Sequence, residues 1–331
     1  MKNNAVSIIA GPCSVDENNI QEIHKIAEIT VQNRLGHRQK AVSGTRVVGL
    51  KSRTDLDATG DGMGMDYEIY QKNIQTLMRG GAIRDFEPLP SALLSQQIMK
   101  QTGMMIATEV MNPIIQLPSF EHRLPAGMFL PWNPSVNQLG WHIEQTAVFA
   151  RRNGWHIGIK NGKWIGDHLQ SADHEEYQGK TTMEKTWAGL VKYVGDIQSS
   201  IILIHRGVDV PGKGDFRNAV VHNIARRVKT ATGALMFFDP SHSYGPKLRS
   251  HIVGAVAEAM RMKISQDEYL YDGVLIEVGT SKTDTEQHIS VAELRELVSV
   301  LASFRDLVAP AKVQKSMKSH DMKKIHTKVQ L

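Results

Sequence analysis

Residues whose side chains could perform chemistry stand at the ends of short apolar runs in this chain. The first is Cys13, the only cysteine among 331 residues, which follows the run beginning at Ile8 and lies in a Gly-Pro loop. A single cysteine cannot form an internal disulfide, so Cys13 is either a small buried residue or a soft metal ligand. Burial is the commoner state of a lone cysteine. The residues that end the later runs shift the balance toward a ligand.

The later apolar runs also end in titratable residues. In chain order these are Lys51 with Arg53 and Thr54, Glu109, Lys160, His205 with Arg206, Asp239 with His242, Glu277, and then Asp284. Any one of them has an ordinary structural explanation. Loops of random composition would not place such residues after nearly every run, so the set predicts one shared site.

Four of these residues form a mixed ligand set: Cys13, His242, Glu277 and Asp284. They offer one thiolate, one imidazole and two carboxylates. This combination suits a borderline divalent ion such as Mn, Fe, Co or Zn, with room left for substrate. We therefore expect a divalent metal cofactor.

Four cationic residues form a second set: Lys51, Arg53, Lys160 and Arg206. Arginine forks and lysine point charges are the groups that bind phosphate and carboxylate. A metal ion beside such cations predicts a phosphorylated, oxygen-rich substrate and Lewis-acid chemistry.

The apolar runs predict the elements that position these residues. The expected strands are 7–12, 46–51, 104–110, 128–132, 156–160, 200–205, 234–238 and 273–278. They lack clean alternation, which is typical of strands buried on both faces. Segments of helical period separate them, and eight such units predict an α/β fold, a (β/α)8 TIM barrel with its site at the carboxyl ends of the strands.

Helical period appears in the segments 21–29, 219–225 and 252–257. The last expected helix, 290–307, opens with a Ser-x-x-Glu capping box at Ser290. The long connection 52–103 has room for a helical pair or an extra loop. We expect one barrel domain over residues 1–310.

The charge distribution argues against nucleic acid as a partner. The net charge is +5, but residues 311–331 carry six lysines against one acid, so the first 310 residues sum to zero. A neutral body with a basic tail is not a nucleic-acid-binding domain, and the tail is expected to be disordered. No apolar run is long enough for a membrane span, no signal peptide is evident, and a single cysteine fits the cytoplasm.

Several segments resemble the signature segments of 3-deoxy-D-arabino-heptulosonate 7-phosphate (DAHP) synthases. They are Gly11-Pro12-Cys13-Ser14, Lys51-Ser52-Arg53-Thr54, Thr108-Glu109-Val110, Ile159-Lys160-Asn161-Gly162, His205-Arg206-Gly207, Asp239-Pro240-Ser241-His242, Ile276-Glu277-Val278 and Asp284-Thr285-Glu286-Gln287. Each is short, but all occur in the family's order between about residues 7 and 308.

The resemblance implies an aldol-like condensation of phosphoenolpyruvate with an aldose phosphate, at the entry to the shikimate pathway and aromatic amino acid biosynthesis. The four-residue metal set would hold the ion that polarises the aldehyde. Lys51, Arg53 and Thr54 would lie between the phosphoenolpyruvate carboxylate and the aldose phosphate. Lys160 and Arg206 would hold the phosphoenolpyruvate phosphate. Glu109 would orient this cluster or a water molecule, unless it is only an ion-pair partner.

The chain departs from the family pattern at three places. The fourth run, Leu130 to Ser135, lacks the arginine that the family uses for the phosphoenolpyruvate phosphate. That contact is either missing or supplied by Lys163 or another residue. His205, counted here with the catalytic residues, replaces a glutamate, and Gly279 stands where the family has histidine. We interpret the chain as a divergent member.

Alternatives remain for the substrate and for the function. The Arg53-Thr54 pair favours erythrose 4-phosphate, whereas the related 3-deoxy-octulosonate 8-phosphate synthases use arabinose 5-phosphate. A barrel that binds metal or a phosphorylated ligand without turnover is a further alternative. Small-molecule substrates and a homo-oligomer, a dimer or a tetramer, are expected by resemblance only.

Overall fold

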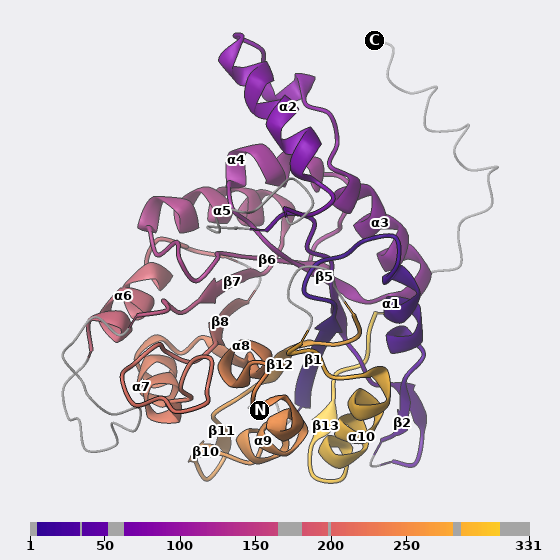
Figure 1. The fold of residues 1–331 in the computed structure, drawn as a ribbon, viewed down its shortest axis with the longest axis vertical. Coiled ribbons are helices and arrows are strands. Elements are labelled where there is room, and N and C mark those ends of the chain that lie inside the picture. Colours follow the sequence, from indigo (N-terminus) through magenta and orange to yellow (C-terminus); the bar gives the residue numbers. More distant parts are fainter. Residues whose placement is uncertain are drawn as a thin grey trace.

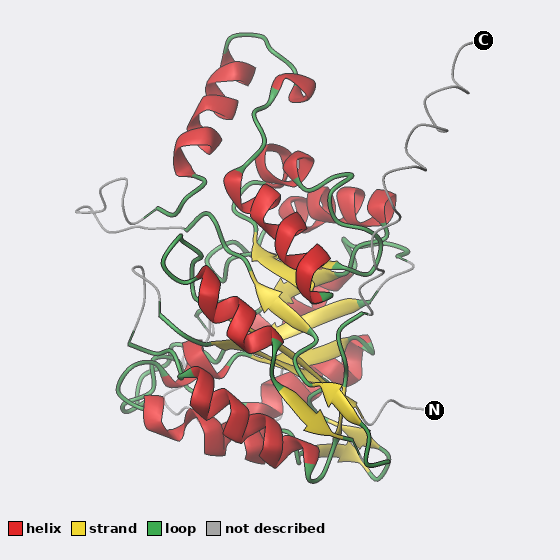
Figure 2. Ribbon diagram, turned by 90° about the vertical axis from the view of Figure 1, so that its right-hand side faces the viewer, coloured by secondary structure: helices red, strands yellow, loops and turns green. Residues whose placement is uncertain are grey.

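A closed barrel of parallel strands forms the centre of the molecule (Figures 1 and 2). The computed structural model describes residues 5–33, 35–51, 63–164, 181–197, 200–280 and 286–311. In this part of the chain eight strands pair in sequence order, and the last pairs with the first from Ser7–Gly273 to Gly11–Glu277. The predicted (β/α)8 barrel is confirmed. Its strands are β1 (Ala5–Gly11), β4 (Gly44–Arg46), β5 (Met105–Glu109), β6 (Phe129–Trp132), β7 (Ile157–Lys160), β8 (Ile201–His205), β9 (Leu235–Phe238) and β12 (Gly273–Glu277).

The second barrel strand differs from its prediction. The apolar run suggested 46–51, but regular pairing covers only Gly44 to Arg46. Beyond it, Val47 donates its amide to Ala107 and the carbonyl of Val48 accepts from the loop after β1. The apolar character of this run therefore reflects burial beside two neighbouring segments rather than a regular ladder.

Helices surround the barrel, as Figure 1 shows. They are α1 (Ile20–Ala27), α2 (Tyr67–Met78), α3 (Pro90–Thr102), α4 (Pro113–Gln116), α5 (Gly140–Asn153), α6 (Thr182–Val191), α7 (His222–Thr232), α8 (Pro240–Tyr244), α9 (Ile252–Ala259) and α10 (Val291–Ala302), with 3-10 turns at Ile83–Asp85, Leu117–Ser119 and Arg249–His251. The long second connection is a helical pair, in which α2 projects from the barrel and α3 returns to it. The Ser290–Glu293 capping box begins α10 as expected. None of the helices in the described ranges is long and apolar enough to cross a bilayer.

Short strands lie outside the barrel. They are β2 (Thr30–Gln32) with β3 (Arg38–Lys40), β10 (Lys263–Ser265) with β11 (Glu268–Tyr269), and β13 (Asp306–Leu307), which pairs with β1. The basic residues 312–331 lie outside the described residues.

The side chains of most barrel strands alternate between two hydrophobic clusters. On β8, Ile202 and Ile204 belong to a small cluster with residues of five other barrel strands and the segment after β4, inside the barrel. Leu203 belongs to the large cluster between the barrel and the helices. This alternation has a period of two, so it decides which residues at the strand ends face the mouth.

Candidate active site

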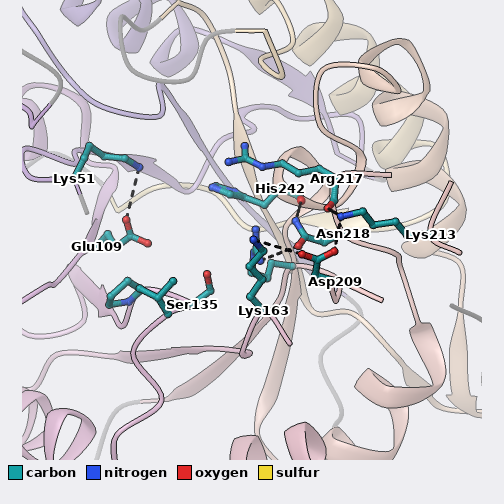
Figure 3. Close-up of a pocket in the computed structure, with 12 residues that line it drawn as sticks. Lys51, Glu109, Ser135, Lys163, Asp209, Lys213, Arg217, Asn218 and His242 are labelled. Atoms are coloured by element: carbon teal, nitrogen blue, oxygen red, sulfur yellow. Dashed lines mark hydrogen bonds and ion pairs between the residues drawn. The ribbon is translucent and has the colours of Figure 1, made fainter. Parts of the chain in front are cut away.

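A cavity of about 370 Å³ opens at the carboxyl ends of the strands (Figure 3). Its lining residues are Lys51, Glu109, Pro134, Ser135, Val136, Lys163, Arg206, Asp209, Lys213, Arg217, Asn218 and His242. Glu109 ends β5, and the other residues come from the segments that follow β4 and β6 to β9. In barrels of this architecture substrates bind at this end. The cavity therefore lies where the sequence predicted the site.

Positive charge dominates this cavity. Five of its lining residues are lysine or arginine, and two are carboxylates. Burial lowers the pKa of Arg206 to about 10, so Arg206 remains charged near neutral pH. Its guanidinium donates to Asn218 at 3.1 Å. The cavity is therefore built for anions.

Asp239 and His242 are positioned by the start of α8. The Asp239 carboxylate accepts from the His242 amide at 3.1 Å, which caps the helix, and also contacts the His242 Nδ1 at 2.9 Å. Burial lowers the pKa of His242 to about 4, against the opposing charge of Asp239, so the imidazole is neutral near pH 7. The Nε2 atom then faces Glu277, with 3.8 Å to the Glu277 Oε1.

Glu277 is fully buried and is paired with Arg46. The Arg46 Nη2 lies 2.9 Å from the Glu277 Oε1, and both side chains are almost inaccessible to water. Burial alone would raise the pKa of Glu277, but the charge of Arg46 outweighs it and holds the pKa well below its usual range. The Glu277 Oε2 accepts from Gln287. Glu277 is therefore a carboxylate at neutral pH.

Trp132 lies between two buried cations. Its ring centroid is 5.7 Å from the Arg46 guanidinium carbon and 5.7 Å from the Lys160 Nζ. Lys160 in turn pairs with Asp239 at 3.0 Å. Cation–π contacts and ion pairs thus connect β4, β6, β7 and β9 below the cavity, and they fix the buried charges relative to one another.

Lys51 links Cys13 to Glu109. Its Nζ lies 3.2 Å from the Cys13 Sγ and 3.7 Å from the Glu109 Oε2. Burial would lower the pKa of Lys51, but the Cys13 sulfur and the Glu109 carboxylate raise it. Burial would raise the pKa of Glu109, and Lys51 and Lys160 lower it. Both Lys51 and Glu109 are therefore charged at neutral pH.

The expected metal ligands fit a divalent ion in their chemistry. His242 has its Nδ1 held by a carboxylate, which is the usual arrangement of a ligating histidine. Its Nε2 faces the ionised Glu277, and Cys13 lies at the same mouth beside Lys51. Within the described residues, no three His, Cys, Asp or Glu side chains already cluster around one point. The fourth expected ligand, Asp284, lies outside the described residues.

His205 is not at the mouth. It ends β8 on the outward face, where its ring lies 6.2 Å from Trp187 of α6 and 6.2 Å from His222 of α7. The Nδ1 contacts the Tyr271 hydroxyl at 2.8 Å, and burial lowers the pKa of His205 to about 3. The structure thus places this expected catalytic residue in the packing between barrel and helices, because it alternates with the inward Ile204.

Comparison with known proteins gives structural matches but no sequence match. No protein-family model and no curated protein matches this chain. A DAHP synthase (phospho-2-dehydro-3-deoxyheptonate aldolase) from Thermotoga maritima matches 92% of the chain and 72% of its own length, with a TM-score of 0.62 and 17% identity. A truncated 3-deoxy-D-arabino-heptulosonate 7-phosphate synthase from the same organism matches 92% of the chain and 90% of its own length, at TM-score 0.60 and 16% identity. This chain shares the fold of these two synthases.

On this shared fold, the mouth brings together most of the expected site residues. Cys13, Lys51, Glu109, Lys160, Arg206, His242 and Glu277 lie around or directly below the cavity. Arg53 and Thr54 lie outside the described residues, as does Asp284. After β6, Pro134 and Ser135 line the cavity without an arginine.

Sequence reasoning missed several residues of this site. Arg46 begins the apolar run that ends at Lys51, and only its position as a charge at the start of that run marks it as special. Asp209, Lys213 and Arg217 occupy a long loop after β8 with no periodic pattern. The sequence marks Lys163 only as an alternative source of a phosphate contact, and the structure places it in the cavity.

Proposed function

We propose that this protein catalyses the metal-dependent condensation of phosphoenolpyruvate with an aldose phosphate. With erythrose 4-phosphate, the products are 3-deoxy-D-arabino-heptulosonate 7-phosphate and inorganic phosphate. One observation carries the proposal: a neutral histidine and an ionised glutamate, His242 and Glu277, face each other beside a cation-lined cavity at the mouth of a DAHP synthase fold.

The reaction forms one carbon–carbon bond and, at carbon 2, replaces one carbon–oxygen bond by another. Carbon 3 of phosphoenolpyruvate attacks the aldehyde carbon, and the aldehyde oxygen becomes a hydroxyl. Water adds to carbon 2 and gives up its two protons, one to the aldehyde oxygen and one to the leaving phosphate, which departs with the former enol oxygen. The site must therefore bind two phosphates and one carboxylate, stabilise negative charge on the aldehyde oxygen and orient one water molecule.

The cations of the mouth suit the anionic groups. Lys160 and Arg206 would hold the phosphate of phosphoenolpyruvate and stabilise its charge as it leaves. Lys51 would contact the carboxylate, and Glu109, 3.7 Å from Lys51, would orient the ammonium group or the attacking water. The low-dielectric surroundings strengthen each of these contacts, since all four side chains are largely buried.

Cys13, His242 and Glu277 would hold the metal ion, with Asp284 as the fourth ligand. The ion would act as a Lewis acid toward the aldehyde oxygen. Asp239 would keep the His242 ring in the orientation that leaves Nε2 for the metal, because it contacts Nδ1. Arg46 would keep Glu277 ionised.

Phosphate release from phosphoenolpyruvate tests this proposal. With Mn2+ present, we expect release that depends on an added aldose phosphate and stops when the metal is chelated. Erythrose 4-phosphate and arabinose 5-phosphate are supplied in parallel, because the Arg53-Thr54 pair that bears on this choice lies outside the described residues.

Substitution of Lys160 tests whether the reaction takes place at the mouth of the barrel. Lys160→Gln is expected to lower kcat by about 10²-fold or more, as for the loss of a group that stabilises developing charge. Lys185→Gln is the matched control, since Lys185 is exposed on α6. Full activity in Lys160→Gln, or activity that survives chelation of the metal, would contradict the proposal.

A further inference from the structure

The outer rim of the mouth carries a cation cluster that the assigned roles leave unused. It consists of Lys163 after β7 and Lys213 and Arg217 in the loop after β8, together with one carboxylate, Asp209. Figure 3 shows this group on the opposite side of the cavity from Lys51 and Glu109, with His242 between them. The cavity thus has two cationic ends.

Asp209 holds the two lysines at the rim. Its carboxylate lies 3.4 Å from the Lys163 Nζ and also pairs with Lys213. The Lys213 ammonium additionally donates to the Arg217 carbonyl at 3.1 Å. One carboxylate is thus shared by two lysines, and the group of four side chains keeps an excess of two positive charges.

Backbone and side-chain hydrogen bonds fix these residues in place. The Asp209 amide donates to the Lys163 carbonyl at 2.7 Å, which joins the loops after β7 and β8. The Arg217 side chain donates to Gln287, which in turn donates to Glu277. The cations are therefore held by the fold around the cavity, and little ordering remains to be done when an anion binds.

We propose that Lys163, Lys213 and Arg217 form a second phosphate subsite, which takes the phosphate of a phosphomonoester at the outer rim. Two excess charges match the charge of a phosphate dianion, and ammonium and guanidinium groups are its usual partners. The assignment rests on the proposed function for the identity of the phosphomonoester, which is phosphoenolpyruvate or the aldose phosphate. The cluster itself does not depend on that function.

Binding of inorganic phosphate tests the subsite without turnover. Calorimetric titration is carried out on the full chain and on Lys163→Gln and Lys213→Gln. Lys247→Gln is the matched control, because Lys247 is exposed, pairs with Asp215 and does not line the cavity. We expect the Kd for phosphate to rise about tenfold in each rim variant and less than about twofold in the control.

Steady-state kinetics then identify the substrate. The same variants are expected to raise KM for one phosphorylated substrate by about tenfold and to keep kcat within about threefold. The substrate whose KM rises is the one whose phosphate binds at the rim.

The outcomes separate the subsite from the proposed function. Turnover with unchanged phosphate affinity and unchanged KM in both rim variants would overturn the subsite while the function stands. Weaker phosphate binding in the rim variants without any turnover would support the subsite and count against the function. Equal weakening in Lys247→Gln would also overturn the subsite, since surface charge alone would then explain the effect.

Discussion

Replacement of Asp66 by asparagine should stabilise the protein above about pH 6, because Asp66 is a buried carboxylate without a cationic partner in its described contacts. Its Oδ1 accepts from the Ser91 amide at 2.8 Å and its Oδ2 accepts from the Ser91 hydroxyl at 2.5 Å. Asparagine can keep both contacts, since its amide nitrogen can donate to the Ser91 hydroxyl instead. The variant therefore removes the charge and preserves the packing.

The size and sign of the effect follow from the pKa of Asp66. Burial raises this pKa from 3.8 to about 6, although the Ser91 hydrogen bonds act in the opposite direction. A raised carboxylate pKa means that the unfolded state loses its proton first. The charged carboxylate therefore lowers the free energy of unfolding of the natural protein. This loss is absent below about pH 4, grows between about pH 4 and 6, and then stays constant at about 3 kcal/mol.

Urea unfolding of both proteins at several pH values from about 4.5 to about 8 measures this difference. We expect the asparagine variant to gain stability over the natural protein as pH rises through this window, up to a plateau. A difference that does not change with pH would refute the assigned pKa. A variant that is less stable at every pH would show that the carboxylate makes contacts that asparagine cannot replace.

Two further predictions concern buried packing, and the first has a control substitution. Arg46→Met leaves Glu277 buried without its partner and should destabilise the protein by about 3–5 kcal/mol in urea unfolding, whereas Arg249→Met removes a partly exposed ion pair and should cost less than about 1 kcal/mol. Equal costs would show that the buried pair has no special role. Gly49→Ala would drive a methyl group into the Asp66 carboxylate, so we expect a loss of about 1–3 kcal/mol in the same assay. Unchanged stability would mean that this segment moves aside.

The position of the candidate site could be predicted from the sequence, because the carboxyl ends of all strands in a parallel barrel lie at the same mouth. The apolar runs predicted the bounds of seven barrel strands to within about two residues. The residues that follow these strands lie together at one mouth of the barrel. The second strand was less predictable, since burial beside two segments gives the same apolar signal as a ladder. Serine and glutamate three residues apart were enough to fix the start of α10.

The sequence could not predict which side chains of a strand point toward the barrel interior and which point toward the helices. His205 and Arg206 are adjacent at the end of β8, yet only Arg206 lines the cavity. A strand buried on both faces has no polar alternation, so the sequence does not mark its inward residues. The rim residues Lys213 and Arg217 belong to a loop whose course depends on contacts far apart in the chain, such as the Arg217–Gln287 hydrogen bond.

Formation of a new carbon–carbon bond tests the proposed function most directly. Phosphoenolpyruvate labelled with 13C at carbon 3 is incubated with the protein, Mn2+ and either erythrose 4-phosphate or arabinose 5-phosphate, and the label is followed by NMR. We predict that the labelled carbon becomes the methylene carbon of a 3-deoxy-2-ketose phosphate, with one phosphate released for each phosphoenolpyruvate consumed. Phosphate release without this carbon–carbon bond, or no reaction with either aldose, would contradict the proposal.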